Sequence, residues 1–356
     1  MKIVLITPLL DLGGGQRYIT ELANYWSKIG HDITIIVLRD GEIFYSISDK
    51  VNVVKLDYKY SGKLSKIFAG LRVFFKLRRK INQLQPDFVL SILSTTNILT
   101  LLATSFLPYK VFIEDVMSPI RSRSKLILLL RKVLYKRATG IIALTNLAKE
   151  MLENETGHSN IKVISNPVNK FLVDETIKKE KIIINVGRLN VYKGQKYFLE
   201  ACAKLKDNDW KFVILGEGEL RNSLEKQAFE LGITDSLIMP GAVKNVNDWL
   251  ARASIFAFSS VSEALPIALI EAMNAGLPCV SFDCVTGPSE MIEDGKNGFL
   301  VPVGDVKLFT SRLKELMDDT TLRNKFSYNT KNIAEKFSIE NISKDILEFC
   351  AVHNSK

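Results

Sequence analysis

Short apolar runs of four to seven residues alternate with longer amphipathic stretches along almost the whole chain. Buried parallel strands read as continuous apolar runs, and the helices that cover them carry one apolar face. The alternation therefore predicts an α/β protein whose parallel sheets are covered by helices on both sides. In the first half the expected strands are residues 3–7, 33–38, 88–92, 111–113, 140–144 and 162–164, and the expected helices include residues 16–29, 64–84 and 126–138.

A polar, lysine-rich segment, VDETIKKEK, follows the sequence Asn166-Pro167-Val168 and interrupts this alternation. We place the linker between two domains here. The domains are expected at residues 1–168 and 169–337, followed by a terminal helix within residues 338–356. Strands of the second domain are expected at residues 182–186, 212–215, 237–239, 255–258, 279–282 and 298–301.

Length and composition agree with two folded domains. A chain of 356 residues is too long for one ordinary hydrophobic core. Its content of 47% hydrophobic and 24% charged residues is typical of a folded globular protein. The longest apolar stretches, near Leu99 and Leu128, are too short or too often interrupted by polar residues for a membrane span. The first residues read as a strand, with Asp11 soon after it, and not as a signal peptide. The four cysteines lack metal-binding spacing, so we expect a reduced, cytoplasmic protein without structural zinc.

The whole net positive charge of +9 belongs to the first domain. Residues 1–167 contain 24 Lys and Arg against 13 Asp and Glu, a net charge of +11, and the remaining residues carry −2. Residues 59–80 and 121–137 contain eight and seven basic residues, respectively, with no acid and with apolar residues at helical spacing. Such helices suit an anionic membrane surface. A solvated helix face is the alternative, and nucleic acid is disfavoured because no nucleic-acid module is recognisable.

The segment SSVSEALPIALIEAMNAG, residues 259–276, carries the strongest chemical signal. It predicts a Ser-rich loop that ends at Glu263, a helix that opens with Pro266 and a stop at Gly276. The helix N-terminus, with about half a positive charge, suits a phosphate. Glu263 and Glu271 can accept hydrogen bonds from two parts of an extended ligand, and we expect sugars, because carboxylates repel phosphates. Alternatively, Glu263 is only a charge at the start of the helix and Glu271 lies on a solvated helix face.

A second segment, INVGRLNVYKG, places Arg188 and Lys193 on the connection between a strand and a helix. A diphosphate leaving group develops negative charge, and the sequence shows no obvious metal cluster to neutralise it. Two fixed cations can do so instead, so we expect neither a metal nor a cofactor. The loop LLDLGGGQ near the start lacks the third glycine of a dinucleotide fingerprint, because Tyr18 stands there, which disfavours an NAD-dependent oxidoreductase.

Together these segments resemble the large retaining glycosyltransferase family four, the glycosyltransferases group 1. The resemblance rests on the E-x7-E pair Glu263 and Glu271, on the G-R-L-x-x-x-K-G pattern around Arg188 and Lys193, and on TGPSEMIEDGKNGFLVPVGD. It implies the GT-B architecture of two doubly wound Rossmann-like domains facing a cleft. The first domain would lie on the acceptor side, the second would bind the nucleotide sugar, and the C-terminal helix would pack back on the first domain. Segments such as SILSTTNIL look most like bacterial enzymes that extend lipid-linked oligosaccharides or surface polysaccharides.

The resemblance implies a role for each of these residues. Glu263 would lie near the transferred sugar, Glu271 would hold the ribose hydroxyls, and Arg188 and Lys193 would bind the diphosphate. Further donor contacts are implied at Gly14, Gly15, Gly218, Val243, Ala264, Leu265 and Ile267. Ordinary structural turns are the alternative explanation for the glycine loops and for the turn at Val243.

One position departs from the family pattern. Many members have a His after the strand at residues 111–113, in a segment like S-E-H near the donor sugar. This chain has Ile113-Glu114-Asp115, so Asp115 is expected at the His position among the catalytic residues. An ionised carboxylate cannot donate the same hydrogen bond. Asp115 is therefore either an active-site residue or a structural turn residue.

The expected activity is retaining transfer of a hexose or N-acetylhexosamine from a nucleotide sugar, with UDP the expected nucleotide, to a lipid-linked oligosaccharide or polysaccharide. No dedicated base is visible, which agrees with the family's proposed front-face route, in which the departing phosphate accepts the proton. An acceptor in the inner leaflet would explain the basic first domain and a peripheral position on the inner face of the cell membrane. The alternatives are a sugar-nucleotide epimerase of the same architecture and a noncatalytic nucleotide-sugar-binding module.

Overall fold

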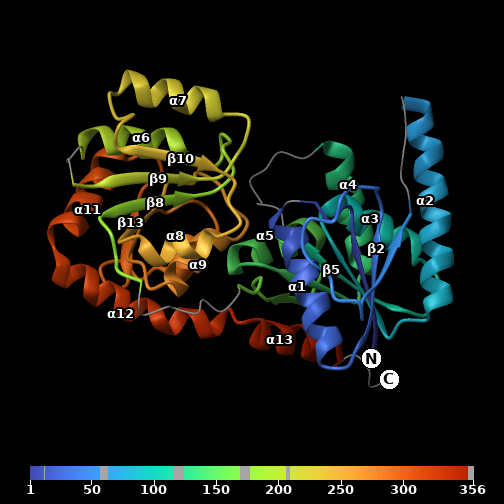
Figure 1. The fold of residues 1–356 in the computed structure, drawn as a ribbon. Helices are drawn as coiled ribbons and strands as arrows, with labels where there is room; N and C mark the ends of the chain where they lie inside the picture. Colours follow the sequence, from blue (N-terminus) through green and yellow to red (C-terminus); the bar gives the residue numbers. More distant parts are fainter. Residues whose placement is uncertain (12, 57–62, 116–123, 169–176, 206–208, 352–356) are drawn as a thin grey trace. The chain divides into compact units, whose positions relative to one another are not determined.

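The computed structural model describes the chain except residues 12, 57–62, 116–123, 169–176, 206–208 and 352–356 and the side chains of residues 63–67 and 331–335. The chain divides into two compact units, shown in Figure 1. The first unit comprises Met1–Pro167 and Ile339–Lys356, and the second comprises Val168–Ser338.

The first unit is built from seven strands and the helices that connect them. The strands are β1 (Lys2–Thr7), β2 (Asp32–Val37), β3 (Asn52–Lys55), β4 (Phe88–Ile92), β5 (Lys110–Asp115), β6 (Gly140–Ala143) and β7 (Ile161–Val163). The helices are α1 (Gly14–Lys28), α2 (Lys63–Leu84), α3 (Ser94–Ala103), α4 (Lys125–Leu134), α5 (Asn146–Thr156) and α13 (Ile339–Ala351), with a short 3-10 helix η1 (Tyr135–Arg137).

The second unit has six strands. These are β8 (Ile182–Val186), β9 (Lys211–Leu215), β10 (Leu237–Gly241), β11 (Ile255–Phe258), β12 (Cys279–Phe282) and β13 (Gly298–Val301). Its helices are α6 (Gln195–Lys204), α7 (Arg221–Glu230), α8 (Val246–Arg252), α9 (Ile267–Asn274), α10 (Pro288–Met291), α11 (Val306–Asp318) and α12 (Thr320–Lys336).

Both sheets are parallel throughout their described pairings and have the strand order of a doubly wound fold. The first sheet has the order β3-β2-β1-β4-β5-β6-β7 and the second has the order β10-β9-β8-β11-β12-β13. In each sheet the first strand of the unit is central, and the chain builds outward from it to one side and then to the other. The predicted α/β class with two Rossmann-like sheets is therefore confirmed.

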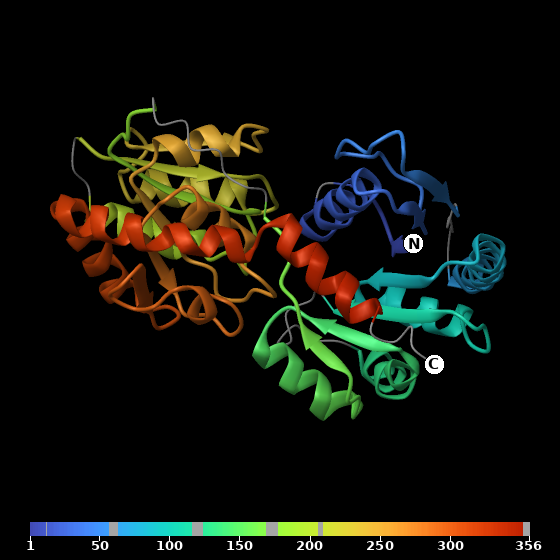
Figure 2. The ribbon, with the colours of Figure 1, turned by 90° about the horizontal axis from the view of Figure 1, so that it is seen from below.

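The terminal helix α13 belongs to the core of the first unit, although the second unit separates it from the rest of that unit in the sequence. Ile346 and Phe349 lie in one buried cluster with residues of α1 and the first sheet. The indole Nε1 of Trp26 on α1 donates a hydrogen bond to Ser343 Oγ at 2.7 Å. Figure 2 shows α13 lying along the elements of this unit.

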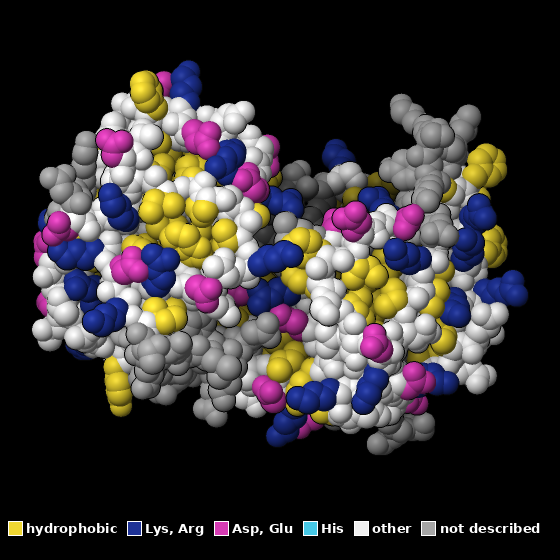
Figure 3. All heavy atoms as spheres, in the orientation of Figure 1, with side chains coloured by type: hydrophobic (Ala, Val, Ile, Leu, Met, Phe, Trp, Pro, Cys, Tyr) yellow, Lys and Arg dark blue, Asp and Glu magenta, His cyan; other side chains and the backbone are white. Residues whose placement is uncertain are grey.

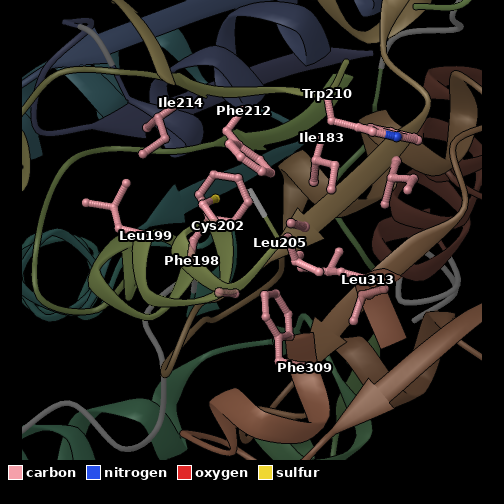
Figure 4. Packing of buried hydrophobic residues seen from close by; sticks show 14 of the residues in the cluster. Ile183, Phe198, Leu199, Cys202, Leu205, Trp210, Phe212, Ile214, Phe309 and Leu313 are labelled. Atoms are coloured by element: carbon pink, nitrogen blue, oxygen red, sulfur yellow. The ribbon is translucent and has the colours of Figure 1, made fainter. Parts of the chain in front are cut away.

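The second unit has a core of its own between its sheet and the helices α6 and α11. Phe198 and Cys202 of α6 pack against Phe212 of β9, and Phe309 of α11 completes the cluster (Figure 4). Burial of each such large apolar side chain stabilises the fold by about 1.5–3 kcal/mol. The sheet edges that carry the functional loops therefore rest on a rigid support.

The strand β3 was not predicted from the apolar pattern. It is a four-residue edge strand, NVVK, whose two valines are only half-buried. An edge strand pairs with one neighbour, β2, so its position depends on backbone pairing more than on burial of its side chains. A short run with weak burial leaves little trace in the periodicity of a sequence.

Candidate functional site

The second sheet changes its direction of growth between β8 and β11. From β8 the chain continues to β9 on one side, while β11 pairs with β8 on the other side. Ligands of doubly wound proteins bind outside the carboxyl ends of the strands at such a point. Residues 187–194 follow β8 and residues 259–266 follow β11. Arg188, Lys193 and Glu263 therefore belong to loops that leave the same edge of the sheet.

Lys193 and Glu263 form an ion pair between these two loops, with 2.6 Å between Nζ and Oε1. Their side chains are 22% and 10% exposed, respectively, so the pair is partly shielded from water. The Lys193 ammonium also lies 5.9 Å from the centre of the Phe258 ring at the end of β11. Reduced contact with water strengthens the attraction relative to a surface pair. The structure thus brings together two of the predicted site residues.

Two buried hydroxyl groups hold the main chain on either side of this ion pair. Ser259 Oγ donates a hydrogen bond to the carbonyl oxygen of Lys193 at 3.0 Å. Thr286 Oγ1 donates to the carbonyl oxygen of Glu263 at 2.5 Å. On the far side of Ser259, Asn185 Nδ2 in β8 donates to the Ser259 hydroxyl at 3.3 Å. These contacts hold the backbone of Lys193 and Glu263 in place, and with it the start of each side chain.

The Thr286 contact depends on an unusual loop after β12. Thr286 has a positive φ of 76°, which is uncommon for a residue with a branched side chain. The next residue, Gly287, has a φ of 112°, and a Cβ there would lie 2.4 Å from Pro266 Cδ. Only glycine fits this approach. Sequence reasoning missed Ser259 and Thr286, because nothing in their local pattern shows which distant carbonyl they reach.

The helix α9 begins one residue later than predicted. Pro266 occupies the position before the first helical residue, and the helix starts at Ile267. Leu265 is buried, whereas Ala264 and Ile267 are half-buried. Glu271 lies in the second turn of α9 and is half-buried. Glu271 thus lies within the helix, whereas Glu263 lies on the loop before it.

Arg188 lies directly after Gly187 at the carboxyl end of β8, and its side chain is exposed. Within the described residues its guanidinium enters no ion pair with an acidic side chain. Its main-chain carbonyl is fixed by Gln195 Nε2, which donates to it at 3.2 Å. The loop therefore holds the Arg188 backbone in place and leaves the charge available to an anion.

The glycine turn after β9 packs against the loop that carries Arg188. A Cβ at Gly218 would lie 2.3 Å from the carbonyl oxygen of Leu189. The Leu189 N–H donates to the Glu217 carbonyl at 2.9 Å. The close packing of these two loops requires glycine at position 218. The expected donor contact at Gly218 stays a prediction. Val243 is half-buried in the turn after β10, close in sequence to Gly241, which has a φ of 90°.

The first sheet has its own switch point between β1 and β4. The loop after β1 leads to Gly14 and Gly15, which form the first turn of α1. Gly14 is exposed and Gly15 is half-buried, so a ligand can approach the backbone of this turn. Tyr18, one turn further, is buried in the core of the unit. The two predicted glycines therefore lie at the ligand-binding edge of the first sheet.

Asp115 ends β5 and lies in a buried network. Its carboxylate accepts a hydrogen bond from Arg131 Nη1, and its side chain is only 3% exposed. Arg131 also donates to both carboxylate oxygens of Glu155 at 2.6 and 2.8 Å, and to Ser94 Oγ at 2.8 Å. Asp115 is therefore part of a buried ion-pair network between β5 and α4. Its expected place near the donor sugar stays a prediction.

The neighbouring Glu114 lies on the opposite face of β5 and is completely buried. Burial raises the pKa of Glu114 to about 8, an effect that Asp115 increases and a hydrogen bond with Tyr18 reduces. The carboxyl group is therefore mostly protonated at pH 7. The two adjacent acids of this segment therefore have different surroundings, since Asp115 faces Arg131 and Glu114 faces the core of the unit.

Cys284 lies close to the ion pair of the second unit and is buried. Burial, with a smaller contribution from the Glu263 carboxylate, raises the pKa of Cys284 to about 12. It therefore remains a neutral thiol. Among the residues with described positions, no group of three or more His, Cys, Asp or Glu side chains is placed to hold a metal ion.

Two protein families match almost the entire chain between them. Residues 12–170 match Glycosyltransferase Family 4, and residues 169–333 match Glycosyl transferases group 1. The boundary between the two matches falls at the boundary between the two units.

Similar proteins come from bacterial glycan synthesis. The chain is 29% identical to a Campylobacter jejuni N-acetylgalactosaminyltransferase that acts on an undecaprenyl diphosphate-linked saccharide, over 99% of this chain and 98% of that protein. It is 28% identical to the amylovoran biosynthesis glycosyltransferase AmsD of Erwinia amylovora, over 91% and 92% of the two chains. Anabaena Alr3699/HepE, solved with UDP-glucose, has a TM-score of 0.82 at 19% identity, over 99% of this chain and 100% of that one.

Proposed function

Because the chain belongs to the group 1 glycosyltransferases of family 4, we propose that it transfers a hexose or N-acetylhexosamine from a UDP-sugar to a lipid-linked or polysaccharide acceptor. The observation that carries this proposal is the Lys193–Glu263 ion pair at the switch point of the second sheet, with the exposed Arg188 on the same loop as Lys193. The Campylobacter relative, which acts on an undecaprenyl diphosphate-linked saccharide, supports the acceptor class.

The donor diphosphate would bind Arg188 and Lys193. When the sugar departs, its C1–O bond breaks and negative charge collects on the phosphate oxygen. Fixed cations stabilise that charge more strongly in the transition state than in the bound donor, and this difference lowers the barrier. Glu263 holds the Lys193 ammonium at 2.6 Å, so the cation is already oriented before a donor binds.

The two glutamates would contact the uncharged parts of the donor. Glu263 would accept hydrogen bonds from the transferred sugar, and Glu271, on the second turn of α9, would accept them from the ribose. In the front-face route the acceptor hydroxyl attacks C1 from the side that the phosphate leaves, and its proton passes to the departing phosphate oxygen. This route retains the anomeric configuration and needs no separate protein base.

A panel of nucleotide sugars tests the donor. The full chain is incubated with UDP-glucose, UDP-galactose, their N-acetylated forms and GDP-mannose, and free nucleotide is measured over time. We expect slow release of UDP from one or a few UDP-sugars, because these enzymes hydrolyse their donor when no acceptor is present. An isomerised donor without free nucleotide would instead indicate an epimerase, and binding without release would indicate a noncatalytic module.

The first unit would bring the enzyme to an anionic membrane surface. Phe68, Leu71 and Phe75 form an exposed apolar row on α2 at spacings of three and four residues, with the exposed Arg72 and Arg79 beside it. Figure 3 shows Lys and Arg side chains next to hydrophobic ones along the edge that α2 forms.

A similar exposed row lies on α4, where Leu126, Leu129 and Val133 are accompanied by Lys125 and Lys132. Both helices pack on the same face of the first sheet, on either side of α3. Apolar side chains can enter the headgroup region while Lys and Arg bind anionic lipids. The helices in the described part of the chain are too short or too polar to cross a bilayer.

Vesicle flotation tests this surface. We expect the protein to float with vesicles that contain phosphatidylglycerol. It should be released when the salt concentration reaches roughly 0.5 M, because salt ions screen the attraction between the basic side chains and the anionic lipids. Phe75→Glu on α2 is expected to weaken binding several-fold, because it places an acid in the apolar row. Phe229→Glu, which changes another exposed Phe on α7 of the second unit, is the matched control. Binding that salt and Phe75→Glu both leave unchanged would contradict the proposal.

A further inference from the structure

A well-anchored loop at the carboxyl edge of the first sheet leaves large apolar side chains in solvent. The loop spans residues 38–51, between β2 and β3. Within it Ile43 and Phe44 are 43% and 50% exposed. Both residues lie outside the basic helices α2 and α4. Exposed apolar groups of this size in a fixed position indicate a binding surface more often than isolated surface residues do.

The loop is fixed at both of its ends and in the middle. Its first residues extend the pairing of β2 with β1, since Arg39 N–H donates to the Pro8 carbonyl at 3.0 Å. In the middle, Phe44 N–H donates to the Leu10 carbonyl at 3.0 Å. Near the end, Asn24 of α1 donates to the Ser46 carbonyl at 2.9 Å. The backbone that carries the exposed side chains is therefore held by hydrogen bonds at three points along the loop.

The contact with Leu10 places Phe44 beside the glycine loop. Leu10 is buried in the core of the first unit and precedes Gly14 and Gly15 by only a few residues. Phe44 is thus attached by its main chain to the segment that leads into the first turn of α1. The Tyr45 ring stands edge-to-face against the Phe44 ring, with 5.1 Å between the ring centres. This contact restricts the orientation of the Phe44 ring.

The charged residues close to Phe44 along the two loops are of both signs. Asp11, next to Leu10, and Glu42, two residues before Phe44, are exposed acids, and Arg39 is an exposed base of the same loop as Phe44. An anionic lipid surface would favour cations only, as α2 and α4 provide. A saccharide instead offers hydroxyl groups that donate to carboxylates and accept from guanidinium groups, and an apolar C–H face that packs on an aromatic ring. The mixture of charges around an exposed ring therefore fits a neutral saccharide.

We propose that Phe44, supported by Tyr45 and flanked by Ile43, is a platform on which a pyranose ring of the acceptor saccharide packs. This inference rests on the proposed transferase function and adds to it a named residue that would contact the acceptor. The reacting hydroxyl belongs to this saccharide, and its binding next to the glycine loop orders the acceptor at the ligand-binding edge of the first sheet. Asp11 and Glu42 accept hydrogen bonds from its other hydroxyls.

The test compares the KM for acceptor with the KM for donor. Methyl glycosides of glucose, galactose, N-acetylglucosamine and N-acetylgalactosamine serve as acceptors, and nucleotide release is followed with the donor found in the panel above. We expect Phe44→Ala to raise the KM for the effective glycoside roughly five- to tenfold, which corresponds to the loss of a stacking contact of about 1.0–1.4 kcal/mol. The KM for donor, measured without acceptor, is expected to stay within twofold.

Two further variants separate stacking from folding. Phe44→Trp keeps an aromatic face and is expected to keep the acceptor KM within about twofold, whereas Phe229→Ala on α7 removes an exposed Phe elsewhere and should change neither constant. An unchanged acceptor KM in Phe44→Ala would overturn the platform, and so would equal losses for donor and acceptor. A wild-type protein that hydrolyses the donor but responds to no glycoside would also overturn it. Absence of nucleotide release with every donor would refute the transferase itself, a distinct result.

Discussion

Lys193→Met is expected to lower kcat about 10²- to 10³-fold, with a smaller change in the KM for donor. The substitution keeps most of the side-chain volume and removes the ammonium that would stabilise charge on the departing diphosphate. Loss of one fixed donor to a developing anion typically has this effect on kcat. Steady-state kinetics with the donor from the nucleotide-sugar panel measure it.

The matched control is Lys196→Met. Lys196 is exposed on α6, three residues after Lys193, and its ammonium lies over the Tyr197 ring at 4.7 Å. We expect this variant to retain wild-type kcat. A Lys193→Met enzyme with near wild-type turnover would show that the ion pair has only a structural role.

Glu263→Gln gives a second measure of the same pair. Lys193 and Glu263 contact each other at 2.6 Å, so their effects should not be additive. We expect the double variant to lose less activity than the product of the two single losses. Additive losses would mean that the two side chains act on separate parts of the donor.

Arg131→Met is expected to destabilise the first unit by about 3–5 kcal/mol, because removal of one partner leaves buried charges without compensation. Arg131 is 2% exposed and joins α4 to β5, α5 and α3 through Asp115, Glu155 and Ser94. Urea unfolding measures the loss. Hydrogen exchange in peptides from residues 1–167 identifies the transition of this unit, since two units can unfold separately.

Two comparisons make the stability prediction specific. Lys132→Met changes the next residue of α4, which is exposed, and is expected to alter stability by no more than about 0.5 kcal/mol. Adding Asp115→Asn to Arg131→Met should restore part of the loss, because it removes a buried negative charge that Arg131 no longer balances. If Arg131→Met lowered stability by less than about 1 kcal/mol, the network would be far better hydrated than its burial indicates.

The Arg131 network also shows why one position was difficult to interpret from sequence. The position of Asp115 after the strand is visible in the sequence, and the family resemblance suggested a role near the donor. Its partner Arg131 lies sixteen residues later in the sequence, on α4. Glu155, which also accepts hydrogen bonds from Arg131, lies later still, on α5. Whether an acid faces a ligand or an arginine depends on the packing of α4 and α5 against the sheet, which no local pattern encodes.

The amino-acid sequence by itself determined the architecture and the chemistry of the second unit's loops. Continuous apolar runs such as IIINV predict buried parallel strands, because both faces of those strands are covered. The segments around Arg188, Lys193, Glu263 and Glu271 predict a site because the first three residues lie on loops that follow strands, and Glu271 lies on the helix after one of these loops. These features are local in sequence, and local backbone preferences and burial are sufficient to specify them.

Only the tertiary structure decided which of these groups touch. It paired Lys193 with Glu263, placed the hydroxyls of Ser259 and Thr286 on their carbonyls, and enclosed Asp115 with Arg131. It also placed Phe44 beside the loop that leads to Gly14. The physical reason is the same for each of these contacts. Hydrogen bonds and ion pairs act over a few ångströms, whereas the residues that form them are up to 70 positions apart in the sequence. Only assembly of the sheets brings them within that distance.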